Sequence, residues 1–440
     1  MKQKMLILLQ TLLAVLCANS YPFLIHNGSA WILFALLLLL QNIMPFFLFC
    51  KFPDRTLRIC NHGYLCLKAF ARATMITVAL QLVLAFQWLW QDWQTWLFGV
   101  ILAVLSLSIL FWNGMVCVYL TSVQLGVKHR TVGLLLGLVP IANLVMLERI
   151  IRITQEEVRF ELQKHIIDKE REKHAICKTK YPILLVHGVF FRDNPYLNYW
   201  GRIPSALMRN GATIYYGEHP SALSIADSAE ILARRIRQIV AETGCEKVNI
   251  IAHSKGGLDC RYAMENLGIA SLVASLTTVN TPHRGCIFAD RLLDKIPTKV
   301  QNKVANAYNT TLKKLGDPAP DFMAAVRDLT SSHCTTFDSE TPIPDGVYCQ
   351  SIGSLQNSLS SGKFPLNMAY HLVKYYDGEN DGLVGLNSFA WGSRYQLITT
   401  AGKRGITHLD IIDMNRENIP GFDVREFYVR LVSDLRQQGL

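Results

Sequence analysis

The sequence lacks three patterns, and each absence excludes a class of protein. Its eleven cysteines include neither a C-x-x-C pair nor the cysteine and histidine spacing of a metal site. Its net charge of +10 comes without the mixture of arginine and aromatic residues that binds nucleic acid, so we expect no nucleic-acid partner. No ionisable residue lies in the middle of a long apolar run, which argues against a transporter or a channel.

Apolar residues are abundant, and they are concentrated near the N-terminus. Hydrophobic residues make up 50% of the 440 residues, and the long apolar runs fall within residues 1–147. The runs 31–50, 73–90 and 95–120 are each long enough to cross a bilayer core of about 30 Å. A run over 5–25 follows a basic start and predicts a further span or a cleaved signal sequence. We therefore predict a transmembrane region with four helical spans over residues 1–147.

A shorter apolar run over 132–147 leaves the number of spans open. It contains glycine, proline and asparagine, so a short fifth span, a re-entrant hairpin and an interfacial helix all fit it. Lysines and arginines keep loops in the cytoplasm, and they gather in the loop expected over 51–72 and again at 128–130. With four spans the rest of the chain lies in the cytoplasm, and with five it lies outside. The arginines that follow favour the cytoplasmic side of a multi-pass membrane protein: Arg149, Arg152 and Arg159.

The rest of the chain has the pattern of an α/β protein. Residues 148–180 mix charges of both signs with isoleucines, which predicts a linker helix. From residue 181 onwards, short apolar runs alternate with helical patterns, as in a parallel sheet with right-handed crossovers. We predict strands over 182–186, 213–216, 248–252, 273–279 and 395–400, and helices over 199–211, 224–243 and 258–267.

The stretch 247–257 organises this α/β part. A buried strand pattern ends there at Ser254, and a helical pattern follows. A serine on such a turn, with small residues around it, is typical of a nucleophile elbow, in which the hydroxyl projects above the sheet. The usual G-x-S-x-G pattern begins here with Ala252 in place of glycine. A structural serine in a turn fits the same residues, so the interpretation depends on partner residues elsewhere.

A serine hydroxyl becomes a nucleophile beside a histidine that takes its proton and a carboxylate that orients the histidine. In this fold they follow in the order serine, acid, histidine. We predict His408, which follows the last strand pattern, as the base and Asp381, in a turn before it, as the acid. The backbone N–H groups of Val189 and Lys255 are expected to form the oxyanion hole. The alternatives are His283, His333 and His371 as base and Asp377 and Asp410 as acid.

Several stretches of the α/β part together resemble the bacterial triacylglycerol lipases, the true lipases of the α/β-hydrolase superfamily. These stretches are 181–188, 199–207, 210–212, 247–257, 380–384 and 408–410, in the family's order. The resemblance implies an α/β-hydrolase fold over residues 181–440. It also implies that Ser254 is the nucleophile, Asp381 the acid and His408 the base.

The resemblance further implies a lid and a calcium ion. The family carries a mobile lid in the position of the segment 286–345, although an ordinary packed insertion explains its helix-prone stretch, interrupted at Pro297, equally well. The family also holds a structural calcium near the histidine with two aspartates, and Asp410 matches one of them. The stretch that would carry the other, 362–365, holds no acid, and one carboxylate is a weak calcium site. We therefore expect that no cofactor is required, and Asp410 is the one candidate metal ligand.

Our leading hypothesis is a membrane-anchored serine hydrolase that cleaves carboxylic esters of lipids through an acyl-enzyme. Its partners would be the lipid ester and the membrane. An acyltransferase with the same triad would differ only in its acceptor, and a non-catalytic membrane scaffold would keep the fold without the activity. The sequence leaves the acyl length, the head group and the oligomeric state open. For Cys334 and Cys349, unpaired buried thiols are the expected state, with a disulfide as the alternative.

Overall fold

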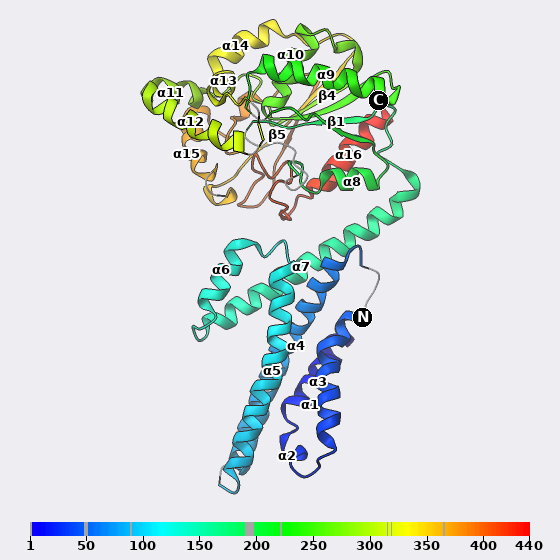
Figure 1. The fold of residues 1–440 in the computed structure, drawn as a ribbon, viewed down its shortest axis with the longest axis vertical. Helices are drawn as coiled ribbons and strands as arrows, with labels where there is room; N and C mark the ends of the chain where they lie inside the picture. Colours follow the sequence, from blue (N-terminus) through cyan, green and yellow to red (C-terminus); the bar gives the residue numbers. More distant parts are fainter. Residues whose placement is uncertain are drawn as a thin grey trace. The chain divides into compact units, whose positions relative to one another are not determined.

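The computed structural model describes residues 2–47, 52–88, 90–189, 198–220, 222–314, 316–317, 319–363 and 366–440. The chain divides into two compact units, Met1–Ile167 and Asp168–Leu440 (Figure 1). We call them the helical unit and the α/β unit. The boundary lies within helix α7, Ala142–Arg171, which occupies most of the predicted linker helix over 148–180.

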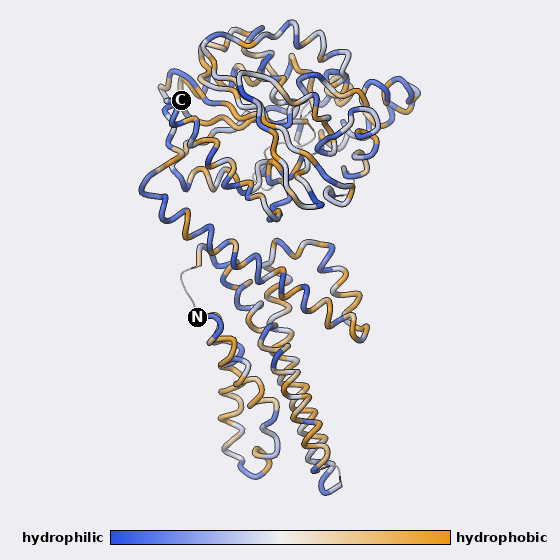
Figure 2. Tube along the Cα trace, turned by 180° about the vertical axis from the view of Figure 1, so that it is seen from behind, coloured by the Kyte–Doolittle hydropathy of each residue, from blue (hydrophilic) through white to orange (hydrophobic). Residues whose placement is uncertain are grey.

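The helical unit consists of helices α1 to α6 and most of α7. The bounds are α1 Lys2–Ala18, α2 Tyr21–Leu24, α3 Ala30–Phe47, α4 Arg55–Trp88, α5 Trp93–Thr121 and α6 Gly126–Leu136. Among the described residues, the helices long and apolar enough to cross a membrane are α3, α4 and α5, whereas α1, with 17 residues, is shorter. Figure 2 shows apolar colours along much of these helices. The number of spans stays a prediction.

Polar side chains lie inside the helical unit, and large apolar ones face outward. Phe86 is 91% exposed, whereas Gln10 and Gln41 are buried. The Gln10 side chain donates to the Gln41 carbonyl over 2.9 Å. Helices α4 and α5 approach each other closely, because a Cβ on Gly63 would lie only 2.8 Å from the Gly114 carbonyl oxygen. This arrangement, with glycines between helices and apolar groups outside, is typical of helices that face lipid.

The prediction of a loop over 51–72 is wrong from Arg55 onwards, where helix α4 begins. The Asp54 carboxylate accepts a hydrogen bond from the Leu57 N–H over 2.7 Å and so satisfies one of the free donors at the helix start. No proline follows within 55–72 to break the helix. The cationic residues of this stretch therefore lie along a helix.

The α/β unit is built on a 6-stranded sheet in the order β2-β1-β3-β4-β5-β6. All neighbouring strands are parallel. The strands are β1 Ile183–Val186, β2 Ile214–Tyr216, β3 Val248–His253, β4 Val273–Val279, β5 Tyr348–Ser354 and β6 Arg394–Ile398. The parallel sheet with helices between its strands confirms the predicted α/β-hydrolase fold.

Strand β5 was not predicted, because its sequence Tyr-Cys-Gln-Ser-Ile-Gly-Ser has neither a continuous apolar run nor an apolar alternation. It is nevertheless almost fully buried, because it lies between β4 and β6. Its polar groups find partners inside the sheet: the Gln350 side chain donates to Thr277 Oγ1 over 3.0 Å. The strand is therefore stabilised by its position in the sheet rather than by a local pattern.

Helices cover both faces of the sheet. Along β1, Ile183 and Leu185 face the helices α8, Ile203–Arg209, and α16, Val424–Gln437, while Leu184 and Val186 face α9, Ile225–Thr243, and α10, Lys255–Asn266. Successive strand residues point to opposite faces, so a strand covered on both sides must be apolar throughout, as β1 is. The short 3-10 helices are η1 Glu172–His174, η2 Ala270–Leu272, η3 Leu359–Ser361, η4 Leu366–Met368 and η5 Leu386–Ser388.

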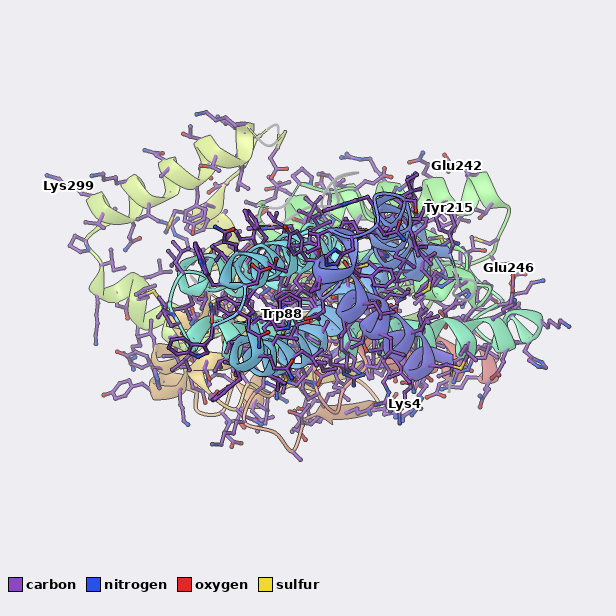
Figure 3. The ribbon with its side chains drawn as sticks, turned by 90° about the horizontal axis from the view of Figure 1, so that it is seen from below. Lys4, Trp88, Tyr215, Glu242, Glu246 and Lys299 are labelled. Atoms are coloured by element: carbon purple, nitrogen blue, oxygen red, sulfur yellow. The ribbon has the colours of Figure 1, made fainter. Side chains whose placement is uncertain are left out.

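A helical insertion connects β4 to β5. It contains α11 Ile287–Lys295, α12 Thr298–Lys314, α13 Phe322–Arg327 and α14 Ser331–Glu340, and a further helix, α15 Ala369–Asp377, follows β5. The break expected at Pro297 falls between α11 and α12. Figure 3 shows Lys299 of α12 at the outer edge of the α/β unit, with its side chain pointing away from the other helices of the insertion. The lysines of the insertion are exposed, and so are several of its apolar side chains: Ile287, Leu292, Val300 and Val304 are 40–47% exposed.

Candidate active site

Ser254 lies on the sharp turn between β3 and α10. Its backbone has φ 54° and ψ −132°, a strained conformation for a residue other than glycine. Two hydrogen bonds maintain it: the Ser254 N–H donates to the Val279 carbonyl over 2.9 Å, and Thr281 Oγ1 donates to the Ser254 carbonyl over 2.8 Å. A Cβ on Gly256 would lie 2.5 Å from the His187 carbonyl oxygen, so only glycine fits there. The turn therefore has the geometry of a nucleophile elbow.

Asp381 and His408 form a buried pair. His408 Nδ1 lies 2.6 Å from Asp381 Oδ2, and the His408 N–H donates to the Asp381 carbonyl over 2.8 Å. The carboxylate also accepts hydrogen bonds from the backbone of Leu383 and Val384 and from the Asn280 side chain, over 2.9, 2.8 and 2.7 Å. The imidazole of His408 contacts the carboxylate through Nδ1, so Nε2 is the nitrogen that can accept a proton.

Ser254 and His408 line the same cavity, which has a volume of about 290 Å³. Val189 and Tyr199 also line it. Most of the remaining wall comes from apolar side chains of the insertion helices: Phe288, Leu292, Leu293, Ile296, Val304, Phe322, Met323 and Val326. The serine and the histidine therefore meet an apolar space large enough for part of a small ligand.

Both predicted oxyanion-hole positions lie beside Ser254. Lys255 is the first residue of α10, where backbone N–H groups are free of helical partners. Val189 lines the cavity, and the preceding Gly188 packs so closely that an added Cβ would lie 2.8 Å from Ser254 Cβ. Residues 190–197, which follow, lie outside the described residues.

The alternative histidines lie elsewhere: none of them is among the described residues that line this cavity. His283 is buried, with Nε2 2.9 Å from Thr278 Oγ1 and Nδ1 accepting from Arg261 over 3.1 Å. Burial lowers the pKa of His283 well below 6.5, and nearby arginines lower it further. His333 is half-exposed and lies 3.8 Å from an aspartate, and His371 lies on α15.

The alternative acid Asp377 has a structural position. Its carboxylate accepts hydrogen bonds from the backbone N–H groups of Ile287 and Phe288 over 2.8 and 2.9 Å. These are the first residues of α11, so Asp377 caps the helix that begins the insertion. Burial raises the pKa of Asp377, and the two backbone hydrogen bonds oppose this shift.

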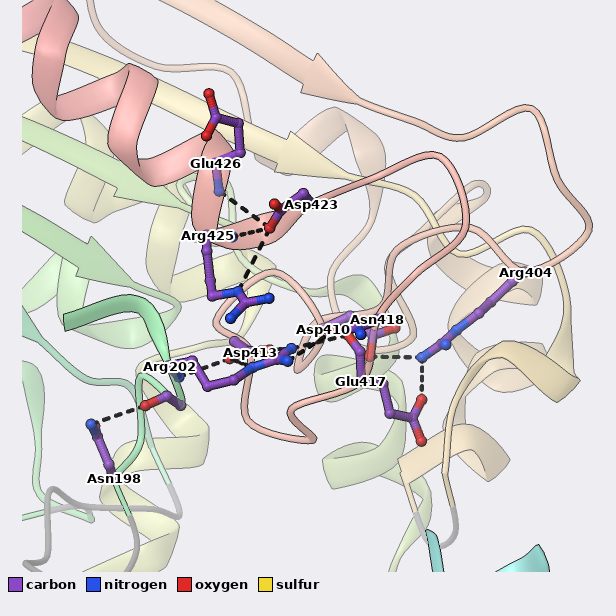
Figure 4. A network of polar contacts seen from close by, with 11 residues as sticks. Asn198, Arg202, Arg404, Asp410, Asp413, Glu417, Asn418, Asp423, Arg425 and Glu426 are labelled. Atoms are coloured by element: carbon purple, nitrogen blue, oxygen red, sulfur yellow. Dashed lines mark hydrogen bonds and ion pairs between the residues drawn. The ribbon is translucent and has the colours of Figure 1, made fainter. Parts of the chain in front are cut away.

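Asp410, the candidate metal ligand, already has a cationic partner. Its carboxylate accepts hydrogen bonds from Arg404 Nη2 and from the Thr407 N–H, each over 3.1 Å. Figure 4 shows Arg404 between Asp410 and Glu417, and Lys363 pairs with Glu417 over 2.6 Å. Among the described residues, no group of three or more histidine, cysteine, aspartate or glutamate side chains could hold a metal ion. Because guanidinium and ammonium groups neutralise these carboxylates, the residues present do not fit a calcium ion.

A buried network of hydrogen bonds joins three loops of the site, and no sequence pattern predicted it. The Gly188 N–H donates to Tyr199 Oη over 3.0 Å, and Tyr199 Oη lies 2.7 Å from His253 Nδ1. His253 Nε2 lies 3.1 Å from the His408 carbonyl oxygen, which can only accept. His253 therefore donates from Nε2 and accepts the Tyr199 hydroxyl proton at Nδ1. Burial lowers the pKa of His253 well below 6.5, which is consistent with this neutral form.

A buried ion pair holds the side chain of Lys255, the residue that follows Ser254. Lys255 Nζ lies 2.6 Å from Asp259 Oδ1 and 3.1 Å from Ser228 Oγ of α9. Burial raises the pKa of Asp259 to about 7, and the charge of Lys255 opposes this shift. The side chain of the residue after the nucleophile thus fixes the start of α10 to α9.

The described cysteines, including Cys334 and Cys349, are free thiols.

The parallel sheet has the α/β-hydrolase fold, and the serine elbow and the Asp381–His408 pair lie at the positions where that fold carries its active site. No family model matches the chain. Triacylglycerol lipases of Pseudarthrobacter phenanthrenivorans and Burkholderia plantarii are each 36% identical to it over 178 residues, which is 37% of this chain. The chain spans about half of their length, 54% and 49%. A lipase of Bacillus licheniformis in its mature form aligns with a TM-score of 0.43 and 22% identity, over 58% of this chain and 92% of its own. The 36% identity to these enzymes confirms the resemblance to bacterial triacylglycerol lipases.

Proposed function

We propose that the protein is a membrane-anchored serine esterase that hydrolyses carboxylic esters of lipids. The observation that carries this proposal is that Ser254 and His408 line one apolar cavity, with Asp381 bonded to His408 on the far side of the imidazole. The similarity to triacylglycerol lipases supports the same reaction class. The outward apolar surface of α3, α4 and α5 supports the membrane anchor.

In the proposed reaction, Ser254 Oγ attacks the acyl carbonyl while His408 Nε2 takes its proton. Asp381 stabilises the imidazolium that forms, and the N–H groups of Val189 and Lys255 donate to the developing oxyanion. His408 then passes the proton to the departing alcohol, which leaves an acyl ester on Ser254. Water, activated by the same histidine, attacks this ester, and the acid departs as Ser254 regains its proton.

The cavity favours an ester with an apolar acyl chain. Apart from Ser254, Tyr199, Gln301 and His408, the residues that line it are apolar. The Gln301 side chain amide donates to the carbonyls of Leu293 and Ile296 over 2.7 and 2.8 Å, so this amide ties the corner between α11 and α12. A charged acyl group would lose its hydration in such a cavity without gaining partners.

The test compares Ser254→Ala with Ser339→Ala, which removes an exposed serine of the same unit. Full-length variants are assayed for p-nitrophenyl ester turnover and for labelling by a fluorophosphonate. Ser254→Ala should lose both, and Ser339→Ala should keep both. Labelling and turnover that survive in Ser254→Ala would remove Ser254 from the proposed role.

The same acyl-enzyme could pass its acyl group to a lipid alcohol, which would make the protein an acyltransferase. Product analysis with and without a lipid acceptor separates the two, because a hydrolase releases free acid in both cases. A non-catalytic scaffold predicts neither labelling nor turnover in the wild type.

A further inference from the structure

The helical hairpin of α6 and α7 ends in an apolar turn that the rest of the helical unit leaves uncovered. No charged residue lies between Arg130 in α6 and Glu148 in α7. At the turn, Leu138 is 94% and Ile141 is 76% exposed, and Leu135 before it is 71% exposed. Further exposed apolar residues on both arms are Leu134, Val139, Leu144 and Val145. Figure 2 shows apolar colours at this turn.

The inner face of the same hairpin is packed, so the turn is folded. Val132 and Leu136 of α6 pack against a core cluster that contains Met146 and Ile150 of α7. Gly133 allows α6 to approach α5, because a Cβ there would lie 2.4 Å from Tyr119 Oη. One face of the hairpin is therefore buried in protein, and the outer apolar face lacks a protein partner among the described residues.

Both arms of the hairpin are tied at their charged ends to the C-terminal end of α5. Arg130 donates to the carbonyls of Tyr119 and Ser122 over 3.0 and 2.6 Å. Glu157 of α7 accepts hydrogen bonds from Ser122 Oγ over 2.5 Å and from the Val123 N–H over 2.8 Å. The chain thus leaves the end of α5, forms the apolar turn and returns to the end of α5.

The hairpin is too short to cross a bilayer. Helix α6 has 11 residues, which is about 16 Å at roughly 1.5 Å per residue. The hydrocarbon core is about 30 Å thick. The exposed side chains that flank the apolar stretch include Lys128, Arg149 and Arg152, which suit anionic head groups at the surface of one leaflet.

We propose that the α6–α7 hairpin inserts its apolar turn into the leaflet beside the C-terminal end of α5 without crossing the membrane. The occupant of the exposed face is then lipid, in continuity with the lipid around α5. This proposal rests on the proposed membrane placement of α3, α4 and α5. Because the chain returns to the face where α5 ends, the residues that follow α7, and with them the α/β unit, lie on that face.

The first experiment measures sidedness in sealed membrane vesicles of one orientation that contain the full-length protein. Lys128→Cys and Arg152→Cys are exposed to a membrane-impermeant maleimide, with the parent protein as background for the native cysteines. Both positions should be labelled from the same side. Labelling from opposite sides would show a fifth span and overturn the proposal.

The second experiment measures insertion. Leu138→Cys, carrying an NBD fluorophore, is reconstituted in phosphatidylcholine and phosphatidylglycerol vesicles that contain nitroxide-labelled acyl chains. Val104→Cys in α5 serves as the membrane reference and Gln163→Cys in α7 as the aqueous one. The probe at 138 should lose most of its fluorescence, as at 104 and unlike at 163. If the probe at position 138 is as little quenched as the probe at position 163 while the probe at position 104 is quenched, the hairpin does not insert and the proposal is overturned. If the probe at position 104 is not quenched either, the membrane placement of α5 is overturned.

Discussion

Replacing Tyr199 by phenylalanine removes the single oxygen atom that joins the loops around Ser254. Tyr199 Oη accepts from the Gly188 N–H and donates to His253 Nδ1, and His253 in turn holds the His408 carbonyl. The substitution keeps the aromatic ring in the cavity wall. It therefore tests the positioning of the oxyanion loop and of His408 without changing the shape of the cavity.

The expected magnitude follows from the two groups that lose their partner. A buried donor or acceptor left unsatisfied costs about 1–3 kcal/mol, so Tyr199→Phe should lower the free energy of unfolding by roughly 2–6 kcal/mol. Loss of one oxyanion-hole donor costs about 100- to 1000-fold in kcat. Because the Val189 N–H would be displaced but not removed, we expect a decrease of kcat by about 10- to 100-fold, with KM little changed.

Tyr428→Phe is the matched control, because Tyr428 Oη is buried in the same unit with no hydrogen-bond partner among the described residues. This control should be neutral or slightly stabilising and should keep its kcat. Both variants are measured for p-nitrophenyl ester kinetics and for urea unfolding. If Tyr199→Phe is destabilised as expected but its kcat stays within about twofold of wild type, the network has no positioning role. If it matches Tyr428→Phe in both measurements, the hydrogen bonds themselves are refuted.

Three further predictions follow from the site. Asp381→Asn should lower kcat by about 10⁴-fold with little change in KM, because the imidazole loses the partner that sets its tautomer; steady-state kinetics with kcat near wild type would contradict this. The free energy of unfolding should decrease as the pH is lowered below about 6.5. Each histidine that is neutral when folded and protonated when unfolded should contribute a loss of about 1.4 kcal/mol per pH unit. A urea midpoint that stays constant from pH 7.5 to 5.5 would contradict this. These histidines, whose pKa burial lowers well below 6.5, are His219, His253 and His283. Chelation of calcium should leave the melting temperature unchanged, because Arg404 already pairs with Asp410, whereas Arg404→Ala should lower the melting temperature. If chelation lowers the melting temperature and Arg404→Ala does not, the site binds calcium.

The sequence predicted those parts of the fold that a local pattern encodes. Strand β1 is a continuous apolar run and β3 is mostly apolar, and α9 lies between the capping residue Ser224 and Gly244, so their bounds could be inferred closely. Strand β5 was missed because its burial depends on the neighbouring strands. The start of α4 has no distinctive signal, because lysines and arginines are typical both of a cytoplasmic loop and of an exposed helix; the absence of a helix breaker is the one local sign of the helix.

The candidate site divides in the same way. Ser254, Asp381 and His408 could be predicted because their order along the chain and their local motifs point to them. The link from Gly188 through Tyr199 and His253 had no such signal, because hydrogen bonds between distant residues leave no spacing in the sequence. The run over 132–147 could not be assigned from its composition, which suits a span and a hairpin equally. The packing of Arg130 and Glu157 onto the end of α5 favours the proposed hairpin.

The most direct test of the central claim is to locate the covalent adduct. The full-length protein is treated with a fluorophosphonate, digested and analysed by mass spectrometry, with and without prior saturation by a lipid ester. We predict a single modified peptide that carries the phosphonyl group on Ser254, with less modification when the ester is present. A phosphonyl group on another residue, or none on the peptide that contains Ser254, would contradict the account.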